Sequence, residues 1–272
     1  MNETPLTLTR ILHPSVLVER GRTRVLFDPC FGDFARRPFT ARVTGIRMPA
    51  PGILPEAIGA LTVIAMTHGH EDHFDAAALS RLTSRDARVV VPTQSQAKKV
   101  RRLGFRDVEV IAPWKTVAGE GWALTATPAR APNARVEISY VLDLGGRRIL
   151  HAGDTASHRF FEEIAERCAP AAACLPVSGV TLLGLRLTMT PGEAARAACA
   201  LAVKVAIPIH AEMRFERASS FFYRAEGSEE SFEAAMKRVA PGVVVLRPRR
   251  GEPCVLDRFL DGAEPRGYPP GQ

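Results

Sequence analysis

The feature that most constrains this chain is a run of metal-binding side chains placed directly after an apolar segment. Residues 61–66 are typical of a buried strand, and the next residues include His68, His70, Asp72 and His73. Imidazole nitrogen and carboxylate oxygen are the ligands that zinc and similar divalent ions prefer. Side chains at i and i+2 of an extended segment point the same way, so His68 and His70 can bind one ion together. The sequence therefore predicts a metal site here.

The alternative interpretation of this cluster is a solvated polar loop. A single histidine is more often a core or surface residue than a ligand, but three of the seven histidines of the chain stand together here. A solvated loop does not explain why so polar a cluster directly follows a buried strand. After the cluster, Asp75 is placed to cap a helix over residues 75–85.

Residues 68–73, His-Gly-His-Glu-Asp-His, resemble the His-x-His-x-Asp-His signature of the metallo-β-lactamase superfamily. The resemblance extends from about residue 10 to residue 255, because other landmarks of the superfamily follow in the same order. It implies an α/β fold, the four-layered αβ/βα sandwich, in which two mixed sheets face each other and helices cover the outsides. It also implies a metal site at the sheet edge, between the two halves.

The resemblance assigns two further ligands. Asp154 follows an apolar strand and corresponds to the aspartate that bridges two ions in the superfamily. His210 ends the strand expected at 203–209 and corresponds to the last metal ligand. Asp28, at the end of another apolar strand, corresponds to a structural residue beside the metal loop. The resemblance thus implies a complete second site, formed by Asp72, His73, Asp154 and His210.

The first site departs from the superfamily pattern. In the superfamily, a histidine on a later loop completes this site beside the two residues that match His68 and His70. Here the corresponding neighbourhood contains Arg130, Ala131 and Asn133 instead. The first site keeps two imidazoles, fewer than the three protein ligands usual in catalytic zinc sites. We therefore expect one bound divalent ion rather than two, with zinc as the first choice and manganese or iron as alternatives.

Within the superfamily, the chain most resembles the branch that contains L-ascorbate-6-phosphate lactonase and N-acylphosphatidylethanolamine phospholipase D. The similarity lies in residues 13–18, in Asp28 and the following proline, in the proline-bearing connection over 30–57, and in residues 190–210. It implies a metal-dependent hydrolase that uses activated water on a lactone, amide or phosphodiester bond. It also implies that Asp72 is catalytic, because the matching residue binds metal and orients the nucleophile or protonates the leaving group.

Two other classes of function stay open at this point. One is a different chemistry on the same fold, either a lyase or an iron redox enzyme. The other is a non-catalytic binding protein with a degenerate metal site, which the missing histidine favours. The retention of all four residues of the second site opposes that interpretation.

Composition limits the partners and the location of the protein. The 272 residues have a net charge of +7, but the basic residues are spread out with little aromatic interleaving. We therefore expect no nucleic-acid partner. The substrate is expected to be a small molecule, and whether it is anionic stays open. No apolar run approaches the ~20 residues of a membrane span, which predicts no stable membrane insertion. The N-terminus lacks a signal-peptide pattern and the five cysteines are scattered, which predicts a cytoplasmic location; homo-oligomerisation stays open.

One domain is expected over residues 1–260, followed by a flexible tail over 261–272. The first elements are predicted to be two strands, over 6–18 and 23–28, joined by a turn. His13 is expected at the edge of the pocket, His151 within a strand, and His158 at the start of a helix. Alternating strands and helices favour α/β architecture. Further helices are predicted at 95–103, 158–167, 191–202 and from 228, and further strands at 87–91, 108–112, 116–128, 136–144, 147–151, 171–177, 243–246 and 253–256.

Overall fold

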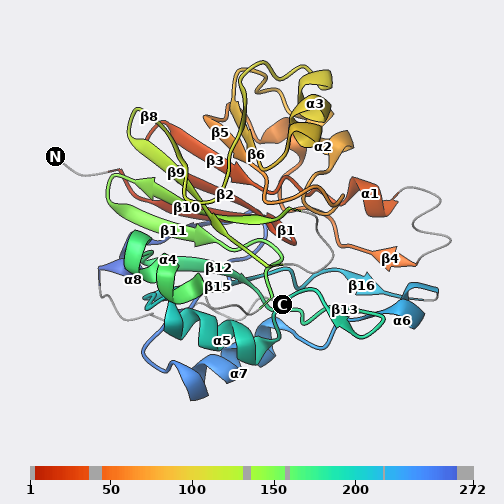
Figure 1. Cartoon of the computed structure of the whole chain (residues 1–272), viewed down its shortest axis with the longest axis vertical. Coiled ribbons are helices and arrows are strands. Elements are labelled where there is room, and N and C mark those ends of the chain that lie inside the picture. Colours follow the sequence, from red (N-terminus) through yellow and green to blue (C-terminus); the bar gives the residue numbers. More distant parts are fainter. Residues whose placement is uncertain (1–3, 37–44, 131–135, 157–159, 217, 262–272) are drawn as a thin grey trace.

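The computed structural model describes residues 4–36, 45–130, 136–156, 160–216 and 218–261 (Figure 1). Its centre consists of two seven-stranded sheets, each with antiparallel and parallel neighbours. The first sheet has the order β19-β1-β2-β3-β5-β6-β7. Its strands span Thr7–Leu12 (β1), Ser15–Arg20 (β2), Thr23–Phe27 (β3), Val63–Ala65 (β5), Arg88–Val91 (β6), Val108–Val110 (β7) and Pro253–Val255 (β19).

The second sheet has the order β18-β15-β12-β11-β10-β9-β8. Three antiparallel hairpin strands stand at one side, and β11, β12, β15 and β18 run parallel to one another. The same division holds in the first sheet, where β3, β5, β6 and β7 are the parallel strands. The strands span Thr116–Gly119 (β8), Trp122–Pro128 (β9), Ile138–Leu144 (β10), Arg147–His151 (β11), Ala172–Pro176 (β12), Val205–Ile209 (β15) and Val244–Val245 (β18).

Helices cover the outer face of each sheet. In Figure 1, α2 and α3 lie on the side of the first sheet, and α4, α5 and α7 lie on the side of the second. The predicted Asp75 cap is confirmed, because its carboxylate accepts a hydrogen bond from the Ala78 amide. Thr190 and Ser228 cap α5 and α7 in the same way. The helices span Asp33–Arg36 (α1), Ala76–Arg81 (α2), Gln94–Arg102 (α3), Phe160–Cys168 (α4), Pro191–Ala200 (α5), Ala218–Phe222 (α6), Glu229–Val239 (α7) and Asp257–Leu260 (α8), with a 3-10 turn at Pro55–Ala57.

The hydrophobic core lies between the sheets and beneath the helices. Phe27 and Val63 from the first sheet share one buried cluster with Leu124 and Tyr140 from the second. Two separate clusters form where the helices pack on the outer faces of the sheets. The order helix, sheet, sheet, helix confirms the predicted four-layered sandwich. Within the described ranges, no helix is long and apolar enough to cross a membrane.

Two small sheets lie beside the large ones. β4 (Ile46–Arg47) pairs with β16 (Arg214–Phe215), which joins the connection after β3 to the segment after His210. The hairpin of β13 and β14 pairs with β17. These short strands were not predicted, because two residues show no periodicity. The last three strands span Thr181–Leu182 (β13), Leu185–Arg186 (β14) and Tyr223–Arg224 (β17).

The predicted strand over residues 6–18 is wrong: the structure has two antiparallel strands there. β1 ends at Leu12 and β2 begins at Ser15. Between them His13 has a φ of 56°, a left-handed conformation that interrupts an extended strand. Pro14 lacks the N–H that a strand residue donates to its neighbour. His158 and tail residues 262–272 lie outside the described ranges.

Candidate metal centre

All the predicted ligands gather at one edge of the two large sheets. β5 leads to the segment with His68, His70, Asp72 and His73, β11 leads to Asp154, and β15 leads directly to His210. These are parallel strands, and the carboxyl ends of parallel strands meet at the same edge of a sheet. The topology therefore brings together side chains that are far apart in the sequence.

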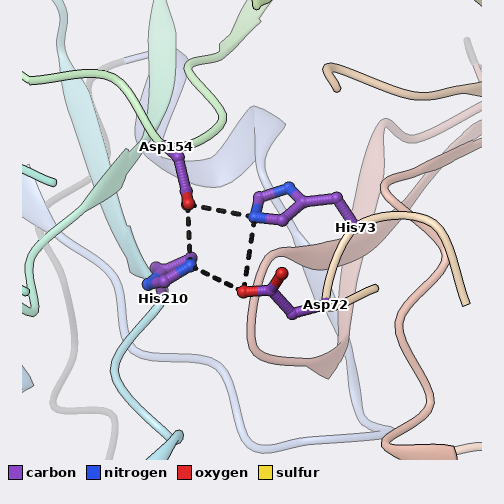
Figure 2. Close-up of side chains that lie close together, drawn as sticks. All are labelled: Asp72, His73, Asp154 and His210. Carbon is purple, nitrogen blue, oxygen red and sulfur yellow. Dashed lines mark hydrogen bonds and ion pairs between the residues drawn. The ribbon is translucent and has the colours of Figure 1, made fainter. Parts of the chain in front are cut away.

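Four side chains form a compact set that we name the second half-site: Asp72, His73, Asp154 and His210. Each offers one ligand atom, and these atoms all lie within 4.8 Å of one another. Asp154 Oδ1 is 3.0 Å from His73 Nε2 and 2.7 Å from His210 Nε2. Asp72 Oδ2 is 3.4 Å from His210 Nε2 and 3.9 Å from His73 Nε2. Figure 2 shows these contacts as a closed ring of two carboxylates and two imidazoles.

Three side chains form the first half-site: His68, His70 and Asp154. His68 Nε2 lies 2.9 Å from His70 Nδ1 and 3.9 Å from Asp154 Oδ2. Asp154 therefore faces the first half-site with Oδ2 and the second half-site with Oδ1. One carboxylate stands between the two sets, as the resemblance implied for this residue.

The Asp154 loop is fixed by close packing. The Asp154 amide donates a hydrogen bond of 2.7 Å to Glu137 Oε1. Gly153 has a φ of 64°, and a Cβ at this position would lie 3.0 Å from the Thr67 side chain. Glycine is therefore required here for both the backbone conformation and the close approach to the neighbouring metal loop.

Asp28 holds His73 from behind. Its Oδ2 lies 2.8 Å from His73 Nδ1, and both its oxygens accept hydrogen bonds from Thr67. A carboxylate at Nδ1 fixes the ring orientation and leaves Nε2 facing the site, an arrangement common behind metal-binding histidines. The structural role that the resemblance implied for Asp28 corresponds to these contacts.

His210 is oriented in a similar way. Its Nδ1 lies 3.2 Å from Ser178 Oγ, so its Nε2 faces Asp154 and Asp72. Its backbone has a φ of 60°, a conformation that non-glycine residues rarely adopt. Backbone strain of this kind gathers at functional sites, where the surrounding structure enforces it.

The charges of the second half-site stabilise one another. Burial alone would raise the pKa of Asp154, but His210 and His73 hold it well below its usual range. Burial alone would lower the pKa of His210, but Asp154 raises it to about 9. The pKa of His73 is raised well above its usual value because Asp154 and Asp28 outweigh burial. Both imidazoles are thus protonated at neutral pH when no ion is present.

In the first half-site, the pKa of the buried histidine is shifted in the opposite direction. Burial, reinforced by the charge of His73, lowers the pKa of His68 to about 3, so this imidazole is neutral at pH 7. Its Nδ1 lies 3.1 Å from Thr67 Oγ1 and 3.8 Å from Glu137 Oε1. Burial and the Asp154 carboxylate raise the pKa of Glu137 well above its usual range.

The superfamily pattern has a further histidine in the first half-site, and Arg130 does not take its place in this chain. The Arg130 side chain is exposed, while its backbone amide donates to Thr155 Oγ1 at 3.1 Å and its carbonyl accepts from Ala156. Position 130 therefore lies against the loop that presents Asp154. Ala131 and Asn133 lie outside the described residues.

The other predicted histidines occupy different environments. His151 stacks on Phe27 at 4.9 Å, and its Nε2 lies 2.8 Å from the Pro14 carbonyl oxygen, which confirms that it packs within its strand. His13, expected at the edge of the pocket, is buried with its ring centroid 3.7 Å from that of His210.

The second half-site fits a divalent metal ion. Its donor set combines two carboxylates with two imidazoles, which suits zinc, manganese or iron. His210 Nε2 is buried and forms no hydrogen bond in the described structure, although a carboxylate oxygen lies 2.7 Å away. Metal-ligand atoms that approach one another without forming a hydrogen bond are expected where all of them point toward one shared ion.

Comparison with known proteins agrees with this geometry. The family model described as the beta-lactamase superfamily domain matches residues 23–211. The chain belongs to this superfamily. It is also 32% identical over 206 residues to the UPF0173 metal-dependent hydrolase of Thermus thermophilus, with 73% of this chain and 80% of that protein covered. Metal-dependent hydrolases of the β-lactamase superfamily are thus the group to which this enzyme belongs.

Solved structures show the same fold at lower sequence identity. A possible metal-dependent hydrolase from Veillonella parvula matches with a TM-score of 0.75 and 18% identity, covering 93% of this chain and 100% of that one. CmlA, a diiron β-hydroxylase from Streptomyces venezuelae, matches with a TM-score of 0.66 and 16% identity, covering 93% of this chain and 54% of that one. The fold therefore occurs in proteins with different chemistry.

Sequence analysis missed three residues that shape the site: Ser178, Glu137 and Glu212. Ser178 follows β12, between β11 and β15, so the rule that sites form at the ends of parallel strands could have identified it. Glu137 and Glu212 gave no signal of this kind. Their contacts with Asp154 and His13 depend on the folded chain alone.

Proposed function

We propose that this enzyme hydrolyses a lactone, amide or phosphodiester bond of a small, anionic substrate with one divalent ion in the second half-site. The observation that supports this most directly is the closed set of Asp72, His73, Asp154 and His210, whose ligand atoms lie within 4.8 Å of one another. Zinc is the proposed ion, with manganese or iron as alternatives that the same donors accept. Five free cysteines support the proposed cytoplasmic location.

The residues of the second half-site divide the work. Asp72, His73, Asp154 and His210 would together hold the ion, and Asp28 and Ser178 fix the His73 and His210 rings. A divalent ion bound there would act as a Lewis acid and bring the pKa of a water molecule down to ~7.

Asp72 is the proposed catalytic residue. Its side chain is the most exposed of the four, at 16%. Its Oδ2 faces His210 and His73, while its other oxygen makes none of the interactions drawn in Figure 2. That oxygen can accept a proton from the attacking water and return it to the leaving group, as general acid–base catalysis requires.

Two hollows lined by the segment that follows His210 provide room for a substrate. One, of about 390 Å³, is lined by Arg47, Arg214 and Arg250, with Glu212 as the opposing carboxylate. The other, of about 660 Å³, reaches Ser178. Both are lined by Arg214, on the segment that directly follows His210. Arg47 is paired with Glu216 and Arg250 with Glu212, so Arg214 is the guanidinium group that we assign to a carboxylate or phosphate group of the substrate.

A first experiment tests the ion. Elemental analysis of the wild type should give about one zinc, manganese or iron per chain, as one set of four protein ligands predicts. His210→Ala should lose this ion, while the exposed Asp107→Asn, which only removes a surface ion pair with Arg88, should retain it. Wild-type protein that binds no ion after reconstitution would contradict the proposal.

A second experiment tests the substrate. Lactones, amides and phosphodiesters, each with and without a carboxylate group, are compared by kcat/KM. Arg214→Gln should raise KM for the anionic member about 10-fold, because a hydrogen-bonded charge is lost. Arg88→Gln is the matched control, since Arg88 begins β6 and therefore lies at the opposite edge of the sheet. Equal rates on charged and neutral substrates would contradict an anionic substrate.

The first half-site favours a second candidate, an iron redox enzyme. Two histidines and one carboxylate, here His68, His70 and Asp154, form the donor set typical of non-haem iron oxygenases. Iron in the purified protein together with substrate-dependent oxygen consumption would support this candidate. Hydrolysis without oxygen consumption would support the hydrolase.

A further inference from the structure

His13 occupies an unfavourable environment beside the second half-site. It lies in the turn between β1 and β2 with a φ of 56°, a conformation that favours glycine. The residue is 2% exposed, and neither ring nitrogen has a hydrogen-bond partner in the described structure. Burial of a polar group without a partner is destabilising. An aliphatic side chain would fill the same space without this penalty.

The His13 ring lies against two residues of the half-site. Its centroid is 3.7 Å from the His210 ring centroid, with 43° between the ring planes. Its Nε2 lies 3.7 Å from Asp72 Oδ2, the same oxygen that faces His210 Nε2 at 3.4 Å. Three imidazoles, those of His13, His73 and His210, thus surround one carboxylate oxygen.

His13 differs from the other two imidazoles in its distance from the rest of the set. The group of atoms that lie within 4.8 Å of one another includes His73 and His210 but not His13. His13 is therefore placed outside the ligand set and within reach of one ligand, Asp72. A shift of about 0.5–1 Å would bring its Nε2 into hydrogen-bond range of Asp72 Oδ2.

The His13 turn is tied to the loop that presents His210. The His13 amide donates a short hydrogen bond to the Glu212 carboxylate, and the His13 carbonyl accepts one of 3.2 Å from the His210 amide. Glu212 is itself held by buried Arg10 at 3.0 Å. These contacts enforce the left-handed backbone at position 13 and fix the ring against His210. Strain that the surroundings enforce beside a functional site is more consistent with a function than with simple packing.

We propose that His13 is a positioning residue of the second half-site: its ring donates an N–H to Asp72 and holds this carboxylate in place for the ion. The inference rests on the proposed metal centre. It accounts for the buried Nε2 without a partner, for the strained turn and for the third imidazole beside Asp72. Partners of this kind behind a metal ligand typically contribute 10–100-fold to metal affinity or activity.

Two matched variants test this proposal. His13→Gln keeps an N–H at a similar distance from the backbone, whereas His13→Leu has a similar volume and no donor. Both impose the same strain on the turn, so their difference isolates the hydrogen bond. His13→Gly serves as a third variant, because it removes the ring and relieves the backbone. Ala202→Gly, at another left-handed position with a φ of 51°, is the control for backbone relief alone.

The readouts are zinc affinity, by competition with a chromophoric chelator, and the d–d spectrum of the cobalt-substituted protein. We expect His13→Leu and His13→Gly to bind zinc 10–100-fold more weakly with an altered cobalt spectrum. His13→Gln should recover most of the affinity, and Ala202→Gly should match the wild type.

Wild-type affinity in His13→Leu, or equal losses in the Leu and Gln variants, would overturn the role of His13. Wild-type protein that binds no zinc would instead overturn the proposed metal centre, so the two failures are distinguishable. None of these measurements requires a known substrate.

Discussion

The two half-sites share Asp154 but differ in how completely the chain supports them. The second half-site has four candidate ligand residues, and its two imidazole rings are held by Asp28 and Ser178. The first half-site has three, and the position that the superfamily pattern gives to a histidine is the exposed Arg130. This inequality is why we propose that the second half-site is the one that retains an ion.

The histidines of the two half-sites also differ in the direction of their pKa shifts. Nearby carboxylates raise the pKa values of His73 and His210, whereas burial lowers that of His68. Negative charge is thus concentrated around the second half-site. A divalent cation gains more from that environment than from a neutral pair of imidazoles.

The largest expected effect follows removal of the shared carboxylate. Asp154→Ala takes a ligand from both half-sites, so metal content should fall from about one ion per chain to near zero and activity should fall to background. Elemental analysis and turnover measurements check this. Full metal content in the variant would show that the two half-sites do not depend on Asp154.

Asp72→Asn should separate binding from catalysis. The amide keeps one oxygen near the ion but does not exchange a proton, so kcat should fall about 10²–10⁴-fold, as for loss of a general acid–base. Metal content should fall much less. Parallel losses of metal and activity would show that Asp72 is only a ligand.

Arg130→His should reduce the difference between the half-sites. The Arg130 side chain is exposed, but its backbone is hydrogen-bonded to the loop that presents Asp154, so we expect a histidine there to turn toward the first half-site when an ion binds. Metal content should rise from about one to about two ions per chain, because the first half-site would then have three imidazoles in addition to the shared Asp154 carboxylate. Arg130→Gln, which removes the charge without adding a ligand, should stay at about one. Equal metal content in both variants would contradict this prediction.

The smallest effect is a difference in proton release. An ion entering the second half-site at pH 7 should displace the protons of His73 and His210, about two per ion, because metal ligands bind deprotonated. His68 is already neutral and should release none. Titration with zinc in weakly buffered indicator solution measures this number, and release near zero would contradict the assigned charges.

The same pKa values determine how metal-free stability depends on pH. The pKa of His210 is raised from 6.5 to about 9, so its contribution is complete below pH 6.5 and is lost as pH rises through about 9. Thermal unfolding of the metal-free protein at pH 6.5 and 9.5 tests this direction. Loss of the same dependence in His210→Ala would confirm the assignment.

Local patterns predicted the parts of the site that lie in one segment. The spacing of His68, His70, Asp72 and His73 indicated a metal site because side chains that bind divalent ions are concentrated there, directly after a buried strand. Asp154 and His210 came from the resemblance, and the strand ends that present them were predicted from apolar runs. The four-layered fold followed from the order of these motifs.

Other features depend on contacts across the fold. His13 lies in a turn that was predicted to be strand, because residues on both sides of it are apolar. The carboxylate that accepts a hydrogen bond from the His13 amide belongs to Glu212, which is 199 positions away in the sequence. Glu137 and Ser178 are ordinary polar residues until the strands bring them beside Asp154 and His210.

The second half-site has a consequence for assembly of the whole molecule. Asp72 and His73 follow a strand of the first sheet, whereas Asp154 and His210 follow strands of the second. A bound ion would therefore link the two halves of the sandwich through its ligands. Ligands that bind only the folded state stabilise it by mass action. Removing metal should then loosen the packing of one half on the other, and scarcity of metal would limit how much folded enzyme a cell can maintain.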